Sequence, residues 1–132
     1  MAGKIIADQI QSSTAGTLDT KYVVSGSAKV WADYNSSAND LIEASLNVAS
    51  KTDSGTGDQI LNYTNNMSST AYAGAGLLHG NAIGNSNVYS YDFQSQNGKR
   101  TDAARLQGFY DPGSVTGTDG NNASYMVMGD LA

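Results

Sequence analysis

Apolar and polar residues alternate along several short segments of this chain, which is the pattern of strands with two different faces. Residues 28–34 show it most clearly, because Val30 and Tyr34 fall on one face and Trp31 falls on the other. Residues 21–24 come just before, and their β-branched pair of valines favours another strand. The sequence therefore predicts two strands joined by a short turn.

The longest alternation covers residues 41–51 and predicts one continuous strand, with its apolar face formed by Ile42, Ala44, Leu46 and Val48. A glycine-rich turn follows at 53–58, and a second apolar segment follows at 59–65. This spacing is typical of a β-hairpin with a loop of four or five residues.

Residues 71–78 consist mainly of alanine, glycine and leucine, which predicts a strand against which another backbone packs closely. Residues 88–94 place Tyr89, Tyr91 and Phe93 on one strand face. Aromatic rows of this kind stack on sugar rings, bind other proteins or fill a core. We expect these three residues, together with Trp31, to lie in the core or at a subunit interface.

Asn97-Gly98 is a strong hairpin signal and predicts a turn at 96–99 with a return strand at 102–110. A last strand is predicted over residues 123–131, with tyrosine and valine on one face and two methionines on the other. The chain then has seven or eight short strands separated by turn signals. That arrangement predicts an all-β fold, an antiparallel β-sandwich or jelly-roll.

The composition changes this picture in one respect. Leucine, isoleucine, valine and phenylalanine make up 23 of the 132 residues, whereas serine, threonine, asparagine and glutamine make up 44. A domain of this size buries about two thirds of its unfolded surface, and much of that surface would here be alanine, glycine and serine. We therefore expect copies of the chain to pack together as a homo-oligomer.

Charge and residue usage exclude several classes of function. The net charge is −5, which disfavours a protein that binds the phosphates of nucleic acid. The chain has no cysteine and no apolar stretch of 18 residues, so we expect neither disulfides nor insertion into a membrane.

The sequence offers little for catalysis. His79 is the only histidine and has no orienting partner nearby in sequence. Most aspartates lie in turns, where the carboxylate usually accepts hydrogen bonds from its own backbone. The loops at 53–58 and 116–122 resemble calcium loops faintly, but they lack the ligand spacing and closing glutamate of an EF-hand. We expect no catalytic residue, metal or cofactor, and a glycan-active enzyme is the least favoured class.

Three stretches together resemble the C-terminal domain of tail-fibre-like proteins from bacteriophages of marine and freshwater bacteria. They are Gly26–Asn35, then Ser45–Ser50 with the hairpin through Asn65, and Tyr125–Leu131. Met67 and Tyr72 fit two further positions of that pattern, and residues 4–11 resemble the start of such proteins. The likeness covers residues 3–72 well and the last ten moderately, whereas residues 73–122 do not align.

The resemblance implies a non-enzymatic virion protein, a homotrimer displayed on the surface of a phage particle. We expect residues 1–20 to form an extended N-terminal arm and linker, and residues 21–132 to form the β-sandwich domain. Residues 1–12 would dock on other virion proteins of the tail or capsid, and the residues expected to make that contact are Ile5, Ile6 and Ile10.

Two functions remain open at this point. In the first, the chain is a short tail fibre or attachment protein that binds a host-surface glycan or protein through loops at 79–87, 95–101 and 111–122. In the second, it is a capsid decoration (cement) or head-fibre protein that clamps neighbouring subunits and stabilises the shell.

Overall fold

A computed structural model describes residues 7–36, 42–79, 88–93, 97–111, 116–117, 119–120 and 122–132. Strands account for 62% of these residues and helix for 7%, so the predicted all-β, antiparallel class is confirmed. The elements are β1 (Gln9–Ser12), β2 (Gly16–Asp19), α1 (Thr20–Gly26), β3 (Ala28–Tyr34), β4 (Ile42–Leu46), β5 (Val48–Gly55), β6 (Asp58–Tyr63), β7 (Ala73–His79), β8 (Val88–Phe93), β9 (Ala103–Asp111), β10 (Thr116–Gly117) and β11 (Asn122–Met128).

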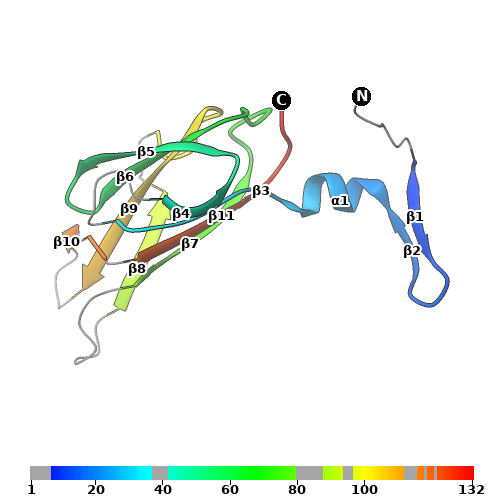
Figure 1. Cartoon of the computed structure of the whole chain (residues 1–132), viewed down its shortest axis with the longest axis horizontal. Coiled ribbons are helices and arrows are strands. Elements are labelled where there is room, and N and C mark those ends of the chain that lie inside the picture. The colour runs from blue at the N-terminus through cyan, green and yellow to red at the C-terminus, as the bar shows by residue number, and fades with distance from the viewer. Residues whose placement is uncertain are drawn as a thin grey trace.

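Nine of these strands form one antiparallel sheet in the order β4-β3-β11-β7-β8-β9-β6-β5, with β10 paired to β9 outside this path. The sheet folds back on itself (Figure 1), so that β4-β3-β11-β7 and β8-β9-β6-β5 face each other. Its two end strands, β4 and β5, are consecutive in the chain and are separated only by Asn47.

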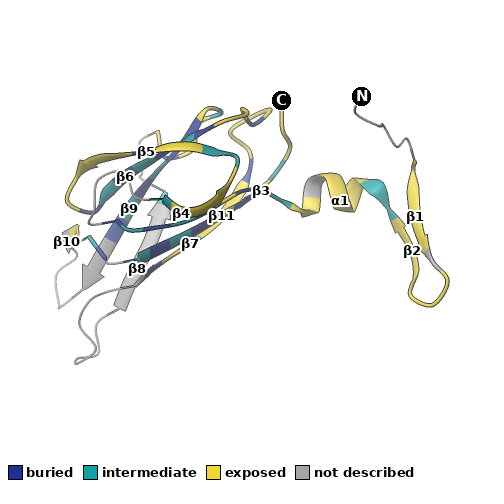
Figure 2. Ribbon diagram, in the orientation of Figure 1, coloured by how far each residue is buried: buried dark blue, intermediate teal, exposed yellow. Residues whose placement is uncertain are grey.

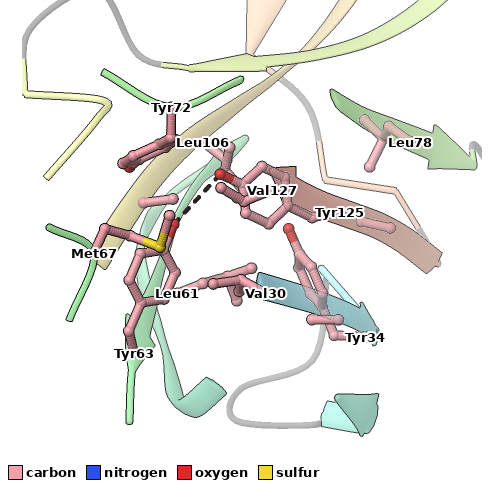
Figure 3. Close-up of a cluster of buried hydrophobic side chains, with 13 residues drawn as sticks. Val30, Tyr34, Leu61, Tyr63, Met67, Tyr72, Leu78, Leu106, Tyr125 and Val127 are labelled. Atoms are coloured by element: carbon pink, nitrogen blue, oxygen red, sulfur yellow. Dashed lines mark hydrogen bonds between the residues drawn. The ribbon is translucent and has the colours of Figure 1, made fainter. Parts of the chain in front are cut away.

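The core lies between the two halves of the sheet, as the dark blue segments of Figure 2 show. Alternate residues of β3, β6 and β11 point inward, because successive side chains of a strand point to opposite faces. Tyrosines fill much of the space that larger aliphatic side chains would otherwise occupy (Figure 3). The buried cluster is Val30, Ala32, Tyr34, Leu61, Tyr63, Met67, Tyr72, Leu78, Ala104, Leu106, Ala123, Tyr125 and Val127, each at most 7% exposed.

The first described residues form an arm that projects from the end of the sheet (Figure 1). Strands β1 and β2 pair as a hairpin, and α1 connects this hairpin to β3. We call residues 9–26 the arm. The prediction of a strand at 21–24 was wrong, because these residues lie within α1. Within the segment 1–20, which was expected to be an extended arm and linker, residues 9–19 instead form a hairpin.

The predicted continuous strand over 41–51 was wrong at one residue. Asn47 has φ of 59°, a left-handed conformation that asparagine tolerates better than most residues, and it separates β4 from β5. Its side chain donates to the Asn65 carbonyl at 3.0 Å and accepts the Asn65 backbone N–H at 2.7 Å. These two hydrogen bonds stabilise a bend at Asn47, which the alternation of apolar residues along 41–51 does not predict.

The predicted hairpin between β8 and β9 is confirmed, but its turn lies further along the chain. Phe93 pairs with Leu106, and a bridge joins Lys99 to Ala104. The Arg100 N–H donates to the Ala103 carbonyl at 3.1 Å, so the tight turn spans residues 100–103. Asn97 does adopt positive φ, at 59°, but it precedes the turn.

The small residues of β7 make room for a side chain. A Cβ at Gly74 would lie 2.6 Å from Cζ of Phe93, so the Phe93 ring occupies the space that a larger residue would need. The expected close approach of another backbone at β7 is therefore not what the structure shows at Gly74. Gly129 has a similar role after β11, because a Cβ there would lie 2.8 Å from both Met67 Cε and Tyr72 Cβ.

Candidate functional site

Among the described residues, no group of three or more histidine, aspartate or glutamate side chains is placed to hold a metal ion. Within the same residues, no helix is long and apolar enough to cross a membrane. His79 is the last residue of β7, and its side chain lies outside the described set. The remaining candidates among the described residues are surfaces and loop clusters.

The two aspartate-rich turns meet in space. Asp53 accepts the Gly55 N–H at 2.9 Å within its own turn, as expected for turn chemistry. Asp119 accepts the Gly57 N–H at 2.7 Å and so connects the turns at 53–58 and 116–122. Both carboxylates thus act as hydrogen-bond acceptors for backbone.

The basic residues near the β8–β9 turn are each engaged by a neighbour. Arg100 pairs with Asp102, and its guanidinium lowers the pKa of that exposed carboxyl. Arg105 pairs with Asp58, whose carboxylate raises the pKa of the guanidinium. Lys99 donates to the Tyr72 carbonyl at 2.9 Å. These partners account for the cluster without a phosphate ligand.

Strands β4, β3, β11 and β7 carry exposed apolar side chains on their outer face. The register places Leu46 beside Trp31, and Trp31 beside Met126. Leu77 is 66% exposed and Trp31 is 39% exposed. A groove of about 490 Å³ runs over this surface, lined by Trp31, Ala32, Asp33, Ala75, Gly76, Leu77, Ser124, Tyr125 and Met126. We call this surface the outer face.

The aromatic residues singled out from the sequence fall in different places. Trp31 lies on the outer face, and Phe93 packs against the core, edge-on to Tyr125 with ring centroids 5.9 Å apart. Tyr89 and Tyr91 belong to β8, but their side chains lie outside the described residues. The structure therefore places Trp31 and Phe93 on opposite faces of the sheet.

The residues expected to dock on a virion lie at the start of the chain. Ile5 and Ile6 lie outside the described residues. Ile10 lies on β1 opposite Leu18 of β2, and both side chains are about half exposed. This pair gives the hairpin an apolar surface that no described part of the chain covers.

The sheet has two ends with different connections. The arm enters β3 at Ala28, which pairs with Met128, so we call this the arm end. At the opposite end, which we call the loop end, Tyr34 pairs with Ala123, and His79 with Asn122. The connections at 35–41, 80–87 and 112–121 therefore start and finish at the loop end.

Two of the three loops expected to bind a ligand are thus brought together, because 79–87 and 111–122 both connect strands at the loop end. The loop at 95–101 is not among them. Lys99 of that loop contacts Tyr72, just before β7 begins at the arm end. The turn of the β5–β6 hairpin joins the loop end instead, through the hydrogen bond from Gly57 to Asp119.

A buried polar cluster underlies the loop end, and the sequence pattern did not reveal it. Lys51 is 3% exposed and donates to the Asn35 carbonyl at 2.7 Å. Gln59 is fully buried and donates to the Ser36 carbonyl at 3.1 Å, while the Ser36 hydroxyl donates to the Gly120 carbonyl. The Gln59 Oε1 atom has no hydrogen-bond partner among the described residues. These contacts fix the chain segments from which the loops leave.

Three tyrosine hydroxyls meet inside the core. Those of Tyr63 and Tyr125 lie 3.5 Å apart, and burial raises the pKa of each phenol well above its ordinary value. Burial also raises the pKa of Tyr72, whose hydroxyl donates to the Arg100 carbonyl at 3.1 Å. All three hydroxyls therefore stay protonated at neutral pH and act in packing and hydrogen bonding.

Some of the residues that carried the resemblance in the sequence lie in this core, whereas others, such as Trp31 and Leu46, are exposed. β3 pairs with β11, and Val30 and Tyr125 both belong to the buried cluster. Met67 pairs with Leu131, and Ser68 donates to the Asp130 carbonyl at 2.9 Å. These stretches therefore contribute to the packing of the sheet, whereas residues 73–122 supply strands β7, β8 and β9 as well as the connections at 80–87 and 112–121. No protein-family model, curated protein or solved structure matches this chain.

Proposed function

We propose that this chain is a structural protein of a bacteriophage particle, displayed on its surface as a short tail fibre or host-attachment protein. The observation that carries the proposal is the two-ended layout of the molecule. An exposed arm leaves one end of the sheet, and the connections at 80–87 and 112–121 leave the other. An attachment protein needs this separation, because one end must be held by the particle while the other meets a host glycan or protein.

The proposal takes the chain as a binding protein without catalysis or cofactor, built as a β-sandwich domain and assembled as a homotrimer. The shared core of the two sheet halves supports the sandwich. The exposed apolar residues of the arm and the outer face support assembly. The chain is rich in serine, asparagine and glycine, which supply adaptable hydrogen bonding.

A capsid decoration protein is the second candidate, and the apolar arm favours it. A projecting arm with an exposed Ile10–Leu18 pair suits insertion between neighbouring shell subunits. In that case the particle would need the protein for the stability of its shell, and the loop end would have no receptor to bind.

The deciding experiment is antibody-gold labelling of intact particles from a phage whose genome encodes this chain. Label on the tail or its fibres is the expected result and supports host attachment. Label spread over the head would support the decoration function instead. Absence of label from purified particles that retain their other structural proteins would contradict both.

A competition experiment tests the loop end directly. Purified protein is added to host cells before infection and is expected to reduce phage adsorption. Replacing residues 80–87 with a glycine-serine segment of equal length should abolish this competition. The matched control replaces residues 94–96, which precede the turn at the arm end, and should compete like the unmodified protein. Equal competition by both variants would exclude the 80–87 loop as a host contact.

A further inference from the structure

The arm exposes more apolar surface than its own structure can stabilise. Its side chains Ile10, Leu18, Tyr22, Val23 and Val24 are between 40% and 59% exposed. A two-stranded hairpin is at best marginally stable alone, and a helix of seven residues is far below the length of about 12 that stands alone in water. Helix α1 also has no side-chain N-cap, because Asp19 instead accepts from Gln9 and pairs with Lys21. The arm therefore needs a surface to pack against.

The joint between the arm and the sheet directs the arm away from its own outer face. The Ser27 hydroxyl donates to the Val23 carbonyl at 2.6 Å, near the end of α1. The Lys29 ammonium donates to the Ser27 carbonyl at 3.2 Å and to the Val23 carbonyl at 3.4 Å. A cation beside the last carbonyls of a helix is favourable. These bonds hold α1 in line with β3, so the arm extends outward (Figure 1).

The outer face has the complementary properties. Leu46, Trp31 and Met126 form a continuous apolar row across three strands, and Leu77 lies on the fourth. Four adjacent strands span roughly 14 Å, and a seven-residue helix is about 10 Å long. The groove on this face therefore matches α1 in size and in chemistry.

We propose that the arm of each chain packs on the outer face of a second copy of the same chain. The two surfaces differ, so the contact is head-to-tail between chains. If two copies exchange arms, or if several copies close into a ring, every arm packs on an outer face and every outer face is covered. This assembly does not depend on where the protein lies on a particle. The test uses the purified chain, so its failure would leave the labelling and adsorption experiments unaffected.

The test measures mass and tryptophan fluorescence together. Trp31 is the only tryptophan and lies in the proposed contact. Sedimentation equilibrium of the full chain should show association, and the Trp31 emission maximum should shift to the blue over the same concentrations as the face is covered. Leu18→Asp in the arm and Leu77→Asp on the outer face should each weaken association by about tenfold or more.

A mixing experiment distinguishes arm-on-face packing from other arrangements. The Leu18→Asp chain keeps an intact face, and the Leu77→Asp chain keeps an intact arm. An equimolar mixture should therefore form a pair of chains held by one intact contact, although neither variant associates alone. Ser54→Asp, which adds the same charge at an exposed position of β5, is the matched control and should associate like the unmodified chain. Leu77→Ser replaces Leu77→Asp if circular dichroism shows that the latter does not fold.

Three outcomes would overturn the proposal. The first is a chain that stays monomeric at every concentration. The second is association that Leu18→Asp leaves unchanged, which would mean that two outer faces pack on each other. The third is a monomer whose Trp31 emission is already blue and shifts to the red in Leu18→Asp, which would place the arm on its own sheet.

Discussion

The sheet and the arm are built from similar residues but hold their shape in different ways. In the sheet, Leu61 and Val127 are fully buried between two halves of the same chain. In the arm, Leu18 and Val24 are about half exposed, and no described part of the chain covers them. The difference indicates that the sheet can fold by its own contacts, whereas the arm depends on contacts with another molecule. Four measurements sharpen or break this comparison.

The largest effect is expected from the core. Leu61→Ala should lower the free energy of unfolding by about 2–5 kcal/mol, because it removes buried methyl groups and leaves a cavity among neighbours that cannot fully relax. Urea denaturation followed by circular dichroism measures the loss. A loss below about 1 kcal/mol would mean that the interior is loosely packed, and the contrast with the arm would disappear.

High pH should destabilise the sheet through its tyrosines. The pKa values of Tyr63 and Tyr125 are raised in the folded protein, so their stabilising contribution is complete below pH ~10 and is lost as pH rises above it. Each tyrosine contributes a slope of about 1.4 kcal/mol per pH unit above that point. Thermal unfolding measured between pH 9 and pH ~11.5 tests this expectation. Tyr125→Phe should lower the slope by the contribution of one tyrosine, because the raised pKa values of Tyr63 and Tyr72 remain. A flat profile in the unmodified chain would contradict the buried placement.

Two glycines offer a comparison between a filled space and an open one. Gly129→Ala should cost about 1–3 kcal/mol, because the new methyl group would press on the Tyr72 Cβ and the Met67 Cε. Gly26→Ala in α1 meets nothing within 4 Å and should stabilise the helix by up to about 1 kcal/mol. Chemical denaturation of both variants gives the signs. Equal effects at both positions would show that Gly129 is not tightly packed.

The smallest effect is expected from the leucine of the arm. Leu18→Ala repeats the chemistry of Leu61→Ala, but in dilute protein it should change the free energy of unfolding by no more than about 0.5 kcal/mol. The measurement is made at a concentration where sedimentation shows single chains. A loss comparable with that of Leu61→Ala would mean that the arm packs against its own sheet.

The sequence predicted those parts of the fold in which the alternation along a single strand shows which residues share a face. Alternation along β3 and β11 placed Val30 and Tyr125 on faces opposite to those of Trp31 and Met126, because side chains on a strand alternate between faces. The structure shows that the first pair is buried and the second exposed, whereas Trp31 had been expected in the core or at a subunit interface. The same reasoning did not find α1. Asp19 at the N-cap position is the one local signal for this helix, but its first and last turns carry no complementary charge and its valines favour strand.

The candidate surfaces were predicted only in part, for a related reason. Trp31 was identified from a local pattern, whereas the N-terminal arm was expected at residues 1–20 and lies at 9–26. The polar cluster at the loop end depends on partners far apart in sequence: the Ser36 hydroxyl meets a carbonyl 84 residues away. The bend at Asn47 likewise depends on Asn65. Contacts of this range are set by the packing of the whole sheet and leave no periodic signal in the chain.

The bend at Asn47 also bears on aggregation. An open sheet edge offers unpaired backbone groups on which further strands can add, and this is how cross-β fibrils grow. Here the two end strands of the sheet belong to one continuous segment, residues 42–55, and the side chain of Asn47 ties the bend between them to Asn65. Among the described residues β4 pairs only with β3 and β5 only with β6, so each end strand keeps one edge of unpaired backbone groups. The bend at Asn47 keeps these edges short, five residues in β4 and eight in β5, which limits the length over which a further strand could add.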